Sequence, residues 1–524
     1  MRFFNTEGPV MAKDHYSLPP LQRWDLQEIL ALIDRKKYFL LHAPRQTGKT
    51  TCLLALADYL NREGRYRAVY ANIEAAQAAR ERVEVGMAAV VQAIANGARW
   101  SLGDEGAQAL ARQVLQEQAA LVGLEGFLTQ WCERSPQPLV LLLDEVDALV
   151  GDTLISLLRQ LRAGYPKRPT QFPQTVVLCG VRDLRDYRIH ARSEASPITG
   201  GSAFNIKAES LRLGDFIQPE VETLLLEHTA ETGQGFTPDA LEQVWTLTLG
   251  QPWLVNALAY EACFRMRDGR DRSQPIPVAR IEQAKENLIL RRETHLDQLA
   301  DKLREDRVRR VIEPMLAGTA LGEVPDDDIQ YLLDLGLCRM APGQGLTLAN
   351  PIYREVLPRM LAFTPQASLP QIAPTWLNPD GSLNPEQLLA AFLRFWRQHG
   401  QPLLGSAPYH EIAPHLVLMA FLHRVINGGG TLEREYAIGM GRMDLCLRYG
   451  PVTLGIELKV WRAGEPDPLA EGLEQLDGYL AGLGLESGWL VIFDRRAGQP
   501  PIRERTASVE MASPEGRRIV VVRA

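Results

Sequence analysis

A short run after an apolar segment has the composition of a loop that binds phosphate. The apolar segment is Phe39-Leu-Leu-His42, and the run is Ala43-Pro-Arg-Gln-Thr-Gly48-Lys49-Thr50. It matches G-x-x-x-x-G-K-[ST] except that alanine replaces the first glycine. In such a loop, backbone N–H groups and a helix N-terminus bind phosphate, the lysine neutralises charge and the hydroxyl ligates Mg²⁺. The predicted contacts are Ala43, Pro44, Arg45, Gln46, Thr47, Gly48, Lys49, Thr50 and Thr51.

A pair of carboxylates after a second apolar segment supports the same chemistry. Pro138-Leu-Val-Leu-Leu-Leu143 is continuously apolar, as a parallel strand buried on both faces requires, and Asp144-Glu145 follow it. We expect Asp144 to hold the Mg²⁺ shell and Glu145 to orient or deprotonate the attacking water. The alternative, a strand and helix that contain Gly-Lys-Thr by chance, does not account for this pair.

Arg182 ends another apolar segment and is a candidate sensor of the γ-phosphate. A fixed cation near that group distinguishes ATP from ADP electrostatically. A plain surface arginine is the alternative reading. Arg185, Arg188 and Arg192 follow, and any of them could act as an arginine finger across a subunit contact. The sequence does not choose among them.

A second group of charged residues lies near the C-terminus. Asp444 ends a Gly-Arg-Met-Asp run, and the next apolar segment, Val452 to Trp461, contains Glu457 and Lys459. Residues two apart in a strand share a face, so Glu457 and Lys459 point the same way, and Asp444 on a neighbouring hairpin strand can approach them. Two carboxylates and one ammonium form a site for Mg²⁺ and an activated water. The alternative is an exposed strand whose charges simply alternate.

Length and composition set the frame for these motifs. A chain of 524 residues is expected to form three or four domains. The net charge of -7 argues against a globally basic nucleic-acid coat, although local basic patches remain open. The six cysteines are scattered, which favours reduced core thiols. No apolar leader segment or membrane span is found, so the sequence predicts a cytoplasmic protein with no membrane partner.

The N-terminal part alternates apolar strands with helices, which predicts a parallel sheet with helices on both faces. Helical sequence follows from Leu211 and includes Gly250-Gln-Pro252. From Leu18 to Phe363 the chain resembles the AAA-like and STAND-type P-loop ATPases, which carry a Gly-x-Pro motif in a helical lid. The resemblance implies ATP and Mg²⁺ as cofactors and a winged helix after the lid. Basic residues before that segment suit DNA binding, but a solvated helix face balanced by acidic residues is the preferred reading.

The C-terminal part is similar to the PD-(D/E)XK nuclease superfamily, from Leu388 to Val522. The resemblance implies that Asp444 and Glu457 are metal ligands and that Lys459 polarises the attacking water or stabilises the transition state. Glu411 matches the acidic residue of the first helix, with Glu433 or Glu435 as alternatives. Gln475 and Tyr479 match a Gln-x-x-x-Tyr motif and share one helical face.

These patterns predict an α/β protein in five parts. They are a P-loop ATPase domain (1–210), a helical lid (211–300), a winged-helix-like domain (301–363), a proline-rich linker (364–387) and an α/β nuclease-like domain resembling restriction endonucleases (388–524).

The predicted function is an ATP-binding and ATP-hydrolysing regulator coupled to Mg²⁺-dependent hydrolysis of nucleic acid, with DNA favoured over RNA. Proteins resembling this combination are associated with prokaryotic defence. The alternative is a STAND-like signalling switch or scaffold whose C-terminal domain binds nucleic acid or recruits a partner without catalysis. Homo-oligomerisation that depends on nucleotide stays open, since a finger supplied in trans would require an assembly.

Overall fold

A computed structural model describes most of the chain. It covers residues 1–183, 188–189, 198–199, 206–291, 293–316, 321–343, 345–368, 374–406, 413–426, 430–438, 441–496 and 498–524. The chain divides into two compact units. Unit 1 comprises Met1–Arg292 and Pro325–Asn350, and unit 2 comprises Glu293–Val324 and Pro351–Ala524.

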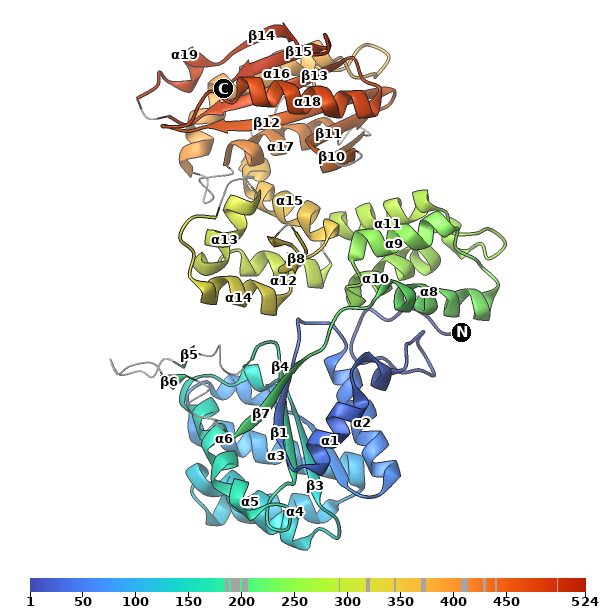
Figure 1. The fold of residues 1–524 in the computed structure, drawn as a ribbon, viewed down its shortest axis with the longest axis vertical. Helices are drawn as coiled ribbons and strands as arrows, with labels where there is room; N and C mark the ends of the chain where they lie inside the picture. Colours follow the sequence, from blue (N-terminus) through green and yellow to red (C-terminus); the bar gives the residue numbers. More distant parts are fainter. Residues whose placement is uncertain are drawn as a thin grey trace. The chain divides into compact units, whose positions relative to one another are not determined.

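Unit 1 is built on a sheet of five parallel strands (Figure 1). Their order in the sheet is β2-β3-β4-β1-β7. The strands are β1 (Tyr38–His42), β2 (Arg67–Asn72), β3 (Leu139–Asp144), β4 (Thr175–Gly180) and β7 (Lys207–Arg212). Six α-helices accompany them, namely α1 (Leu26–Asp34), α2 (Lys49–Glu63), α3 (Val83–Leu102), α4 (Glu105–Glu117), α5 (Ala120–Arg134) and α6 (Gly151–Gly164).

The strands supply alternate side chains to two hydrophobic cores, one on each face of the sheet. On β1, Tyr38 and Leu40 pack with residues of α3, α4, α5 and α6, whereas Phe39 and Leu41 pack with residues of α1 and α2. Side chains alternate across a strand, so a strand covered on both faces must be apolar throughout. The predicted parallel α/β domain with helices on both faces is therefore confirmed.

Short elements and a helical segment complete the first part of unit 1. The 3₁₀ turns are η1 (Pro20–Arg23), η2 (Glu74–Ala79), η3 (Val146–Ala148), η4 (Tyr165–Lys167) and η7 (Asp268–Arg270), and β5 (Arg188–Ile189) pairs with β6 (Ile198–Thr199). The helical segment contains α8 (Gln218–Thr232), α9 (Pro238–Thr248), α10 (Pro252–Tyr260), the π-helical turn η6 (Glu261–Arg265) and α11 (Val278–Arg291). Gly250 has a φ of +81°, and a Cβ there would lie 1.9 Å from Phe216 O, so only glycine fits before α10.

The predicted winged-helix region contributes to both units. Unit 1 contains α14 (Asp326–Leu335) and the hairpin of β8 (Cys338–Ala341) and β9 (Gly345–Leu348). Unit 2 contains α12 (Thr294–Lys302), α13 (Asp306–Leu316) and α15 (Pro351–Ser368). The helix α15 passes Pro365, so the first residues of the predicted linker are helical. A proline inside a helix removes one hydrogen bond, and this cost does not always end the helix. The five-part division of the chain stays a prediction.

The rest of unit 2 is a mixed six-stranded sheet with helices (Figure 1). Its strand order is β10-β11-β12-β13-β15-β14. The strands are β10 (Gly430–Ile438), β11 (Gly441–Tyr449), β12 (Val452–Trp461), β13 (Ser487–Asp494), β14 (Ala507–Ala512) and β15 (Arg518–Arg523). The first three strands are antiparallel, β12, β13 and β15 are parallel, and β14 is antiparallel to β15. The helices are α16 (Pro385–Ser406), α17 (Ala413–Ile426), α18 (Leu469–Leu483) and α19 (Ile502–Arg505).

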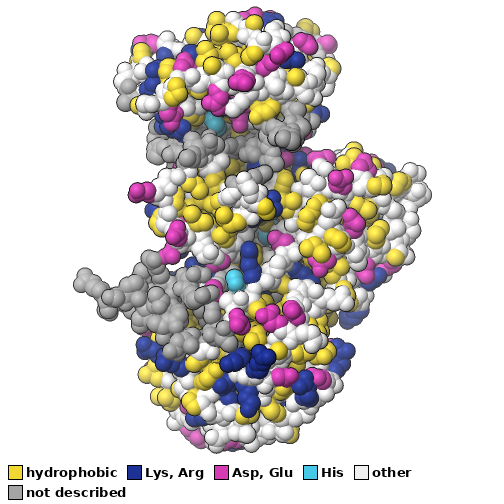
Figure 2. Space-filling view, in the orientation of Figure 1, with side chains coloured by type: hydrophobic (Ala, Val, Ile, Leu, Met, Phe, Trp, Pro, Cys, Tyr) yellow, Lys and Arg dark blue, Asp and Glu magenta, His cyan; other side chains and the backbone are white. Residues whose placement is uncertain are grey.

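Three global expectations can be compared with the structure. All six cysteines are buried and free, as predicted for core thiols. Among the described residues, no helix has both the length and the apolar character that a membrane crossing needs. On the face shown in Figure 2, Lys and Arg side chains gather over the N-terminal α/β domain, although the net charge is -7. Charge is thus unevenly distributed over the surface.

Candidate functional sites

The backbone of the loop between β1 and α2 requires a glycine at one of the two glycine positions of the motif. Gly48 has a φ of +93°, and a Cβ at this position would lie 2.7 Å from Arg23 Nη1. Glycine is therefore needed at position 48. Ala43 continues β1 instead, because its N–H donates to Gly180 O at 3.3 Å and its φ is not positive. This extended conformation suits alanine, which explains why the first glycine of the motif is dispensable here.

Lys49 and Thr50 begin α2 and face the loop and β3. The Lys49 ammonium is buried and donates to Ala43 O and Pro44 O, both at 2.9 Å. The Thr50 hydroxyl donates to Asp144 Oδ2 at 2.7 Å, and Tyr70 donates to the same oxygen at 3.0 Å. Asp144 is fully buried, so the structure brings together the hydroxyl and the carboxylate that the sequence assigned to one Mg²⁺ shell. Hard oxygen donors of this kind fit a magnesium ion.

Glu145 follows Asp144 in a left-handed backbone conformation, with a φ of +60°. A non-glycine residue there is strained, and such strain clusters at functional sites. Burial raises the pKa of the Glu145 carboxyl, and the charges of Asp147 and Asp144 raise it further. Asp147 in turn accepts from the Val181 N–H at 3.2 Å, which ties this turn to the end of β4. A carboxyl with a raised pKa is suited to accept a proton.

Arg182 lies just beyond β4 and contacts α14. Its Nε lies 3.8 Å from Asp334 Oδ2, and its guanidinium lies 4.8 Å from the ring centre of Tyr331. The role of Arg182 as a γ-phosphate sensor stays a prediction. Arg185 and Arg192 lie outside the described residues, and for Arg188 only the backbone is described.

A pocket beside the loop brings in residues that the sequence analysis missed. It is lined by the N-terminal segment, the phosphate-loop residues Gln46 to Gly48, and the helical segment through Phe216, Trp253 and Asn256. Asn256 Nδ2 donates to Pro252 O at 2.8 Å, but its buried Oδ1 has no hydrogen-bond partner among the described residues. An unmatched buried acceptor in a pocket favours a ligand that donates a hydrogen bond.

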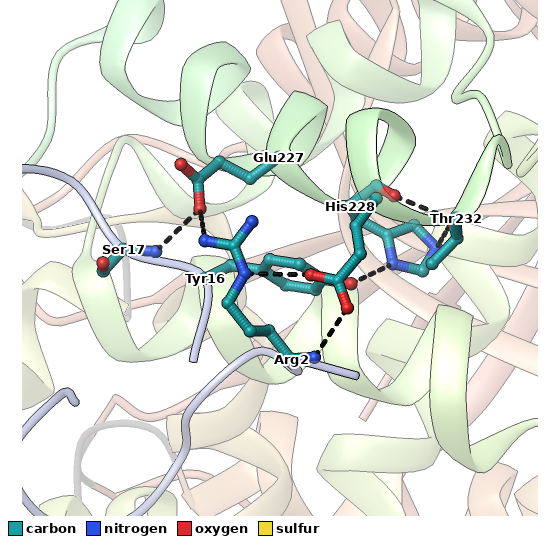
Figure 3. A network of polar contacts seen from close by, with 7 residues as sticks. Arg2, Tyr16, Ser17, Glu227, His228 and Thr232 are labelled. Atoms are coloured by element: carbon teal, nitrogen blue, oxygen red, sulfur yellow. Dashed lines mark hydrogen bonds and ion pairs between the residues drawn. The ribbon is translucent and has the colours of Figure 1, made fainter. Parts of the chain in front are cut away.

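The N-terminal segment is held against α8 by polar contacts (Figure 3). Arg2 donates from Nη1 to Glu227 and from Nε to Glu231, both at 2.9 Å. The Tyr16 hydroxyl lies 3.1 Å from Nδ1 of the fully buried His228. On the other side, the Val10 N–H donates to the Thr51 hydroxyl at 3.1 Å. The segment therefore connects α8 to the phosphate loop, a contact across the chain that local sequence patterns do not signal.

The C-terminal sheet brings together the second group of predicted residues. Asp444 on β11 accepts from the Leu458 N–H at 2.8 Å, which places its carboxylate beside β12. Lys459 Nζ lies 3.4 Å from Glu457 Oε1. It also donates to Gln475 Oε1 of α18 at 2.5 Å. The structure therefore brings these side chains together, while their roles in catalysis stay a prediction.

The carboxyl group of Glu457 is buried in this cluster. Burial raises the pKa of its carboxyl to about 8, and the charge of Asp444 adds to the shift against the opposing effect of Lys459. Its Oε2 atom is buried without a hydrogen-bond partner among the described residues. Two close carboxylates, one with an unmatched oxygen, fit a divalent cation that would relieve their repulsion. Within the described part of the chain, no three His, Cys, Asp or Glu residues gather as a metal cluster.

Two more α18 residues border this site. Glu471, which the sequence analysis missed, lies 3.3 Å from Lys459 Nζ and accepts from Gln475 Nε2 at 3.0 Å. Its spacing of four residues before Gln475 was the available signal. Burial raises the pKa of the Tyr479 hydroxyl, and the charges of Glu457 and Asp444 raise it further against the opposing effect of Lys459.

The predicted acidic residue of the first helix, Glu411, lies outside the described residues. Of its two alternatives, Glu433 lies on β10 opposite Cys446, and for Glu435 only the backbone is described.

Replacing Glu457 by glutamine should stabilise the metal-free protein. Between the ordinary pKa of 4.5 and about 8, the unfolded carboxyl is ionised while the folded one retains its proton, so stability falls as pH rises. Glutamine does not ionise, so the stability of Glu457→Gln does not fall in this way as pH rises. Thermal unfolding in EDTA should show no gain for Glu457→Gln near pH 4 and a gain of about 1–3 kcal/mol near pH 8. A gain that does not change with pH would contradict this assignment.

Comparisons with known proteins concern the fold. The parallel sheet, the loop before α2 and the carboxylate ending β3 define an α/β domain of the architecture used by P-loop ATPases. No family model and no curated protein matches the chain.

Several solved structures are similar. The Walker-type ATPase PABY2304 of Pyrococcus abyssi is 14% identical, covering 68% of this chain and 99% of its own, with a TM-score of 0.47. Cdc6p from Pyrobaculum aerophilum is 14% identical, covering 63% and 88%, with a TM-score of 0.36. The RuvB Holliday junction branch migration motor of Thermotoga maritima is 15% identical, covering 62% and 89%, with a TM-score of 0.32. At these values, an assignment of activity must come from the sites themselves.

Proposed function

We propose that this protein is a nuclease whose activity is regulated by ATP binding and hydrolysis. One observation carries the nuclease assignment: Asp444, Glu457 and Lys459 converge with Gln475 on one face of the C-terminal sheet. The substrate is nucleic acid, with DNA favoured over RNA. The hydrogen bond from Thr50 to the buried Asp144 supports a separate site for magnesium and nucleotide in the same chain.

At the first site, the chain's residues would bind ATP and position water. Lys49 can exchange its two carbonyl acceptors for phosphate oxygens, and Thr50 and Asp144 would hold Mg²⁺. Glu145 would accept a proton from the attacking water, consistent with the raised pKa of its carboxyl. Asn256 Oδ1 would accept a hydrogen bond from the exocyclic amine of adenine, a donor that guanine lacks at the same position.

At the second site, Asp444 and Glu457 would hold Mg²⁺. A bound magnesium lowers the pKa of water and neutralises charge that develops on the phosphate. Lys459 would donate to the attacking water or the phosphate oxygens. Gln475 and Glu471 fix the position of its ammonium through contacts of 2.5 and 3.3 Å. A donor held in place before the reaction needs no reorganisation in the transition state.

The helix α14 offers a physical route by which nucleotide could alter the rest of the chain. A Cβ at Gly336 would lie 2.7 Å from Pro44 of the phosphate loop, and Arg212 donates to Leu333 O at 3.1 Å. Together with the Arg182 contacts, these place the C-terminal half of α14 against the nucleotide domain. Movement of the loop on nucleotide binding would therefore be transmitted to α14 by packing.

A nucleotide-driven switch with a C-terminal domain that binds without cutting is the second candidate. The observation that favours it is that, among the described residues, no three His, Cys, Asp or Glu side chains form a metal cluster beside Asp444 and Glu457. Two protein carboxylates with water can hold magnesium, so the nuclease remains the first candidate.

The test is a cleavage assay of the full-length protein. Labelled single- and double-stranded DNA and RNA would be incubated with Mg²⁺, with and without ATP. The proposal expects cleavage of at least one substrate that EDTA abolishes and whose rate ATP changes. Slow ATP turnover, nucleotide-dependent assembly and intact nucleic acid would instead establish the switch.

Asn256→Leu should weaken ATP binding without affecting the triphosphate contacts. Loss of one well-placed acceptor in a buried pocket is expected to raise Kd for ATP by roughly tenfold. The affinity for inorganic triphosphate, measured in the same titration, should be unchanged. Equal loss for both ligands would show that the substitution disturbs the fold rather than base recognition.

A further inference from the structure

A basic and aromatic surface extends from the Lys459 site along the sheet. The strands β12, β13 and β15 are parallel, so their C-terminal ends meet at one edge. We define the Trp461 surface by the residues at this edge, Trp461, Arg495, Arg496, Arg505 and Arg523. None of these residues has a role in the proposed function.

The strand register places this surface on the same face as the Lys459 site. Glu457, Lys459 and Trp461 are successive alternate residues of β12, and Trp461 packs against the core beneath α18. Lys459 pairs with Ile492, and Ile492 pairs with Arg523, so the three share one face of the sheet. Neighbouring strands lie about 4.8 Å apart, which puts the Arg523 backbone about 10 Å from that of Lys459.

Trp461 carries a fixed guanidinium on its ring. Arg496 Cζ lies 3.4 Å from the ring centre, and Arg523 Cζ lies 5.4 Å from it. Arg496 Nε and Nη2 donate to Asp494 at 3.0 and 2.7 Å, so the third guanidinium nitrogen can donate to an external acceptor. Because Arg496 covers the indole, the tryptophan does not serve as a stacking platform for a base. It orients the arginine instead.

The surface carries more positive than negative charge. Arg495, Arg496, Arg505 and Arg523 are accompanied by the carboxylates of Asp494 and Asp467, with Arg523 donating to Asp467 at 2.7 Å. Burial lowers the pKa of Arg505, and Arg495 and Arg496 lower it further against the opposing effect of Asp494. The Arg523 and Asp467 side chains are each 36% exposed. Such a surface ion pair is weak and can yield to a phosphate.

We propose that the Trp461 surface binds the phosphodiester backbone of the nucleic-acid strand that is cut at Lys459, without reading its bases. This inference rests on the proposed nuclease function. Arginine presents a rigid set of donors that matches phosphate oxygens. Backbone contacts position a strand and carry no sequence information, so the surface holds strands of any sequence across the cleavage site.

The test measures binding separately from cleavage. Full-length protein without divalent cations would be titrated against fluorescent DNA of two unrelated sequences, and anisotropy recorded over roughly 50–200 mM salt. The double variant Arg496→Gln/Arg523→Gln should bind both sequences roughly tenfold more weakly, with the slope of log K against log salt reduced by about two. The double variant Arg496→Lys/Arg523→Lys should retain most of the binding and of the slope.

Arg518→Gln is the matched control. Arg518 lies at the opposite end of β15, is exposed, and also forms an ion pair, with Glu510. Its substitution should change neither affinity nor slope. If the glutamine double variant unfolds at a lower temperature than wild type, the single variant Arg523→Gln would be compared with wild type instead, because Arg523 is the more exposed of the two arginines. Wild-type affinity and slope in these glutamine variants would overturn the proposal, and so would binding of polyglutamate as tight as that of DNA.

Failure of this inference and failure of the proposed function give different results. DNA binding that depends on Arg496 and Arg523, without any cleavage by wild type, would refute the nuclease and leave the surface as a binding site. Cleavage and binding that are both unchanged in the glutamine double variant would refute the surface and leave the nuclease. Lys459→Ala should cut roughly 100-fold or more slowly, and its DNA binding should still weaken roughly tenfold when Arg496→Gln/Arg523→Gln is added, because these arginines are separate from the ammonium.

Discussion

Replacing Lys459 by alanine should reduce cleavage of nucleic acid by roughly 100-fold or more, because a preorganised cation at the reacting phosphate is removed. The ammonium is held by Gln475 at 2.5 Å and lies 3.4 Å from Glu457, which fixes it beside the carboxylates that would hold magnesium. Asp444→Asn should have a comparable effect, since it removes one of the two carboxylates that would hold magnesium. Single-turnover rates at saturating Mg²⁺ would measure both.

Glu474 supplies the control for this prediction. It lies on the same helix as Gln475, one residue before it, and is exposed. Glu474→Gln should cut at the wild-type rate, whereas Gln475→Ala should slow cleavage because Lys459 loses its main fixed partner. Cleavage that survives Lys459→Ala would show that the cluster on β11 and β12 is not the reaction centre.

Lys49→Ala and Glu145→Gln should separate nucleotide binding from hydrolysis. Removing the Lys49 ammonium should weaken ATP binding by roughly 100-fold, because the main cation facing the phosphates is lost. Glu145→Gln should leave ATP affinity nearly unchanged and lower the turnover rate by roughly 100-fold, as expected when a general base is neutralised. Nucleotide affinity and steady-state phosphate release would be measured for both.

The two variants also test the link between the sites. If nucleotide controls cleavage, Lys49→Ala should make the cleavage rate insensitive to ATP. Glu145→Gln binds ATP without hydrolysing it, so with ATP present its cleavage rate should stay at the value of the ATP-bound protein. Lys36→Ala is a suitable control, because Lys36 is exposed and lies at the opposite end of β1 from the phosphate loop. Normal hydrolysis by Glu145→Gln would exclude Glu145 as the base.

Local sequence patterns predicted much of the site formed by the phosphate loop and Asp144. The parallel sheet could be predicted from apolar strands such as Leu139–Asp144. A strand that is buried on both faces is apolar throughout, and this continuous run is visible in the sequence. The placement of Thr50 beside Asp144 could also be predicted. Thr50 follows the C-terminal end of one parallel strand and Asp144 ends another, and the C-terminal ends of parallel strands lie at the same edge of the sheet. The pocket did not follow, because the N-terminal segment and Asn256 meet only through packing across the chain.

The sequence by itself determined which residues of the second site share a face. The period of two in β12 aligns Glu457 with Lys459, and the spacing of four residues in α18, close to one helical turn, aligns Gln475 with Tyr479. Such periods are properties of the backbone and need no distant contact.

Only the tertiary structure decided how the elements approach one another. It brought α18 over β12 so that Gln475 reaches Lys459, buried Glu457 until the pKa of its carboxyl rose, and set Arg496 on Trp461. Side-chain burial, charge coupling and stacking depend on packing between segments that are distant in sequence, and a local pattern carries no information about that packing.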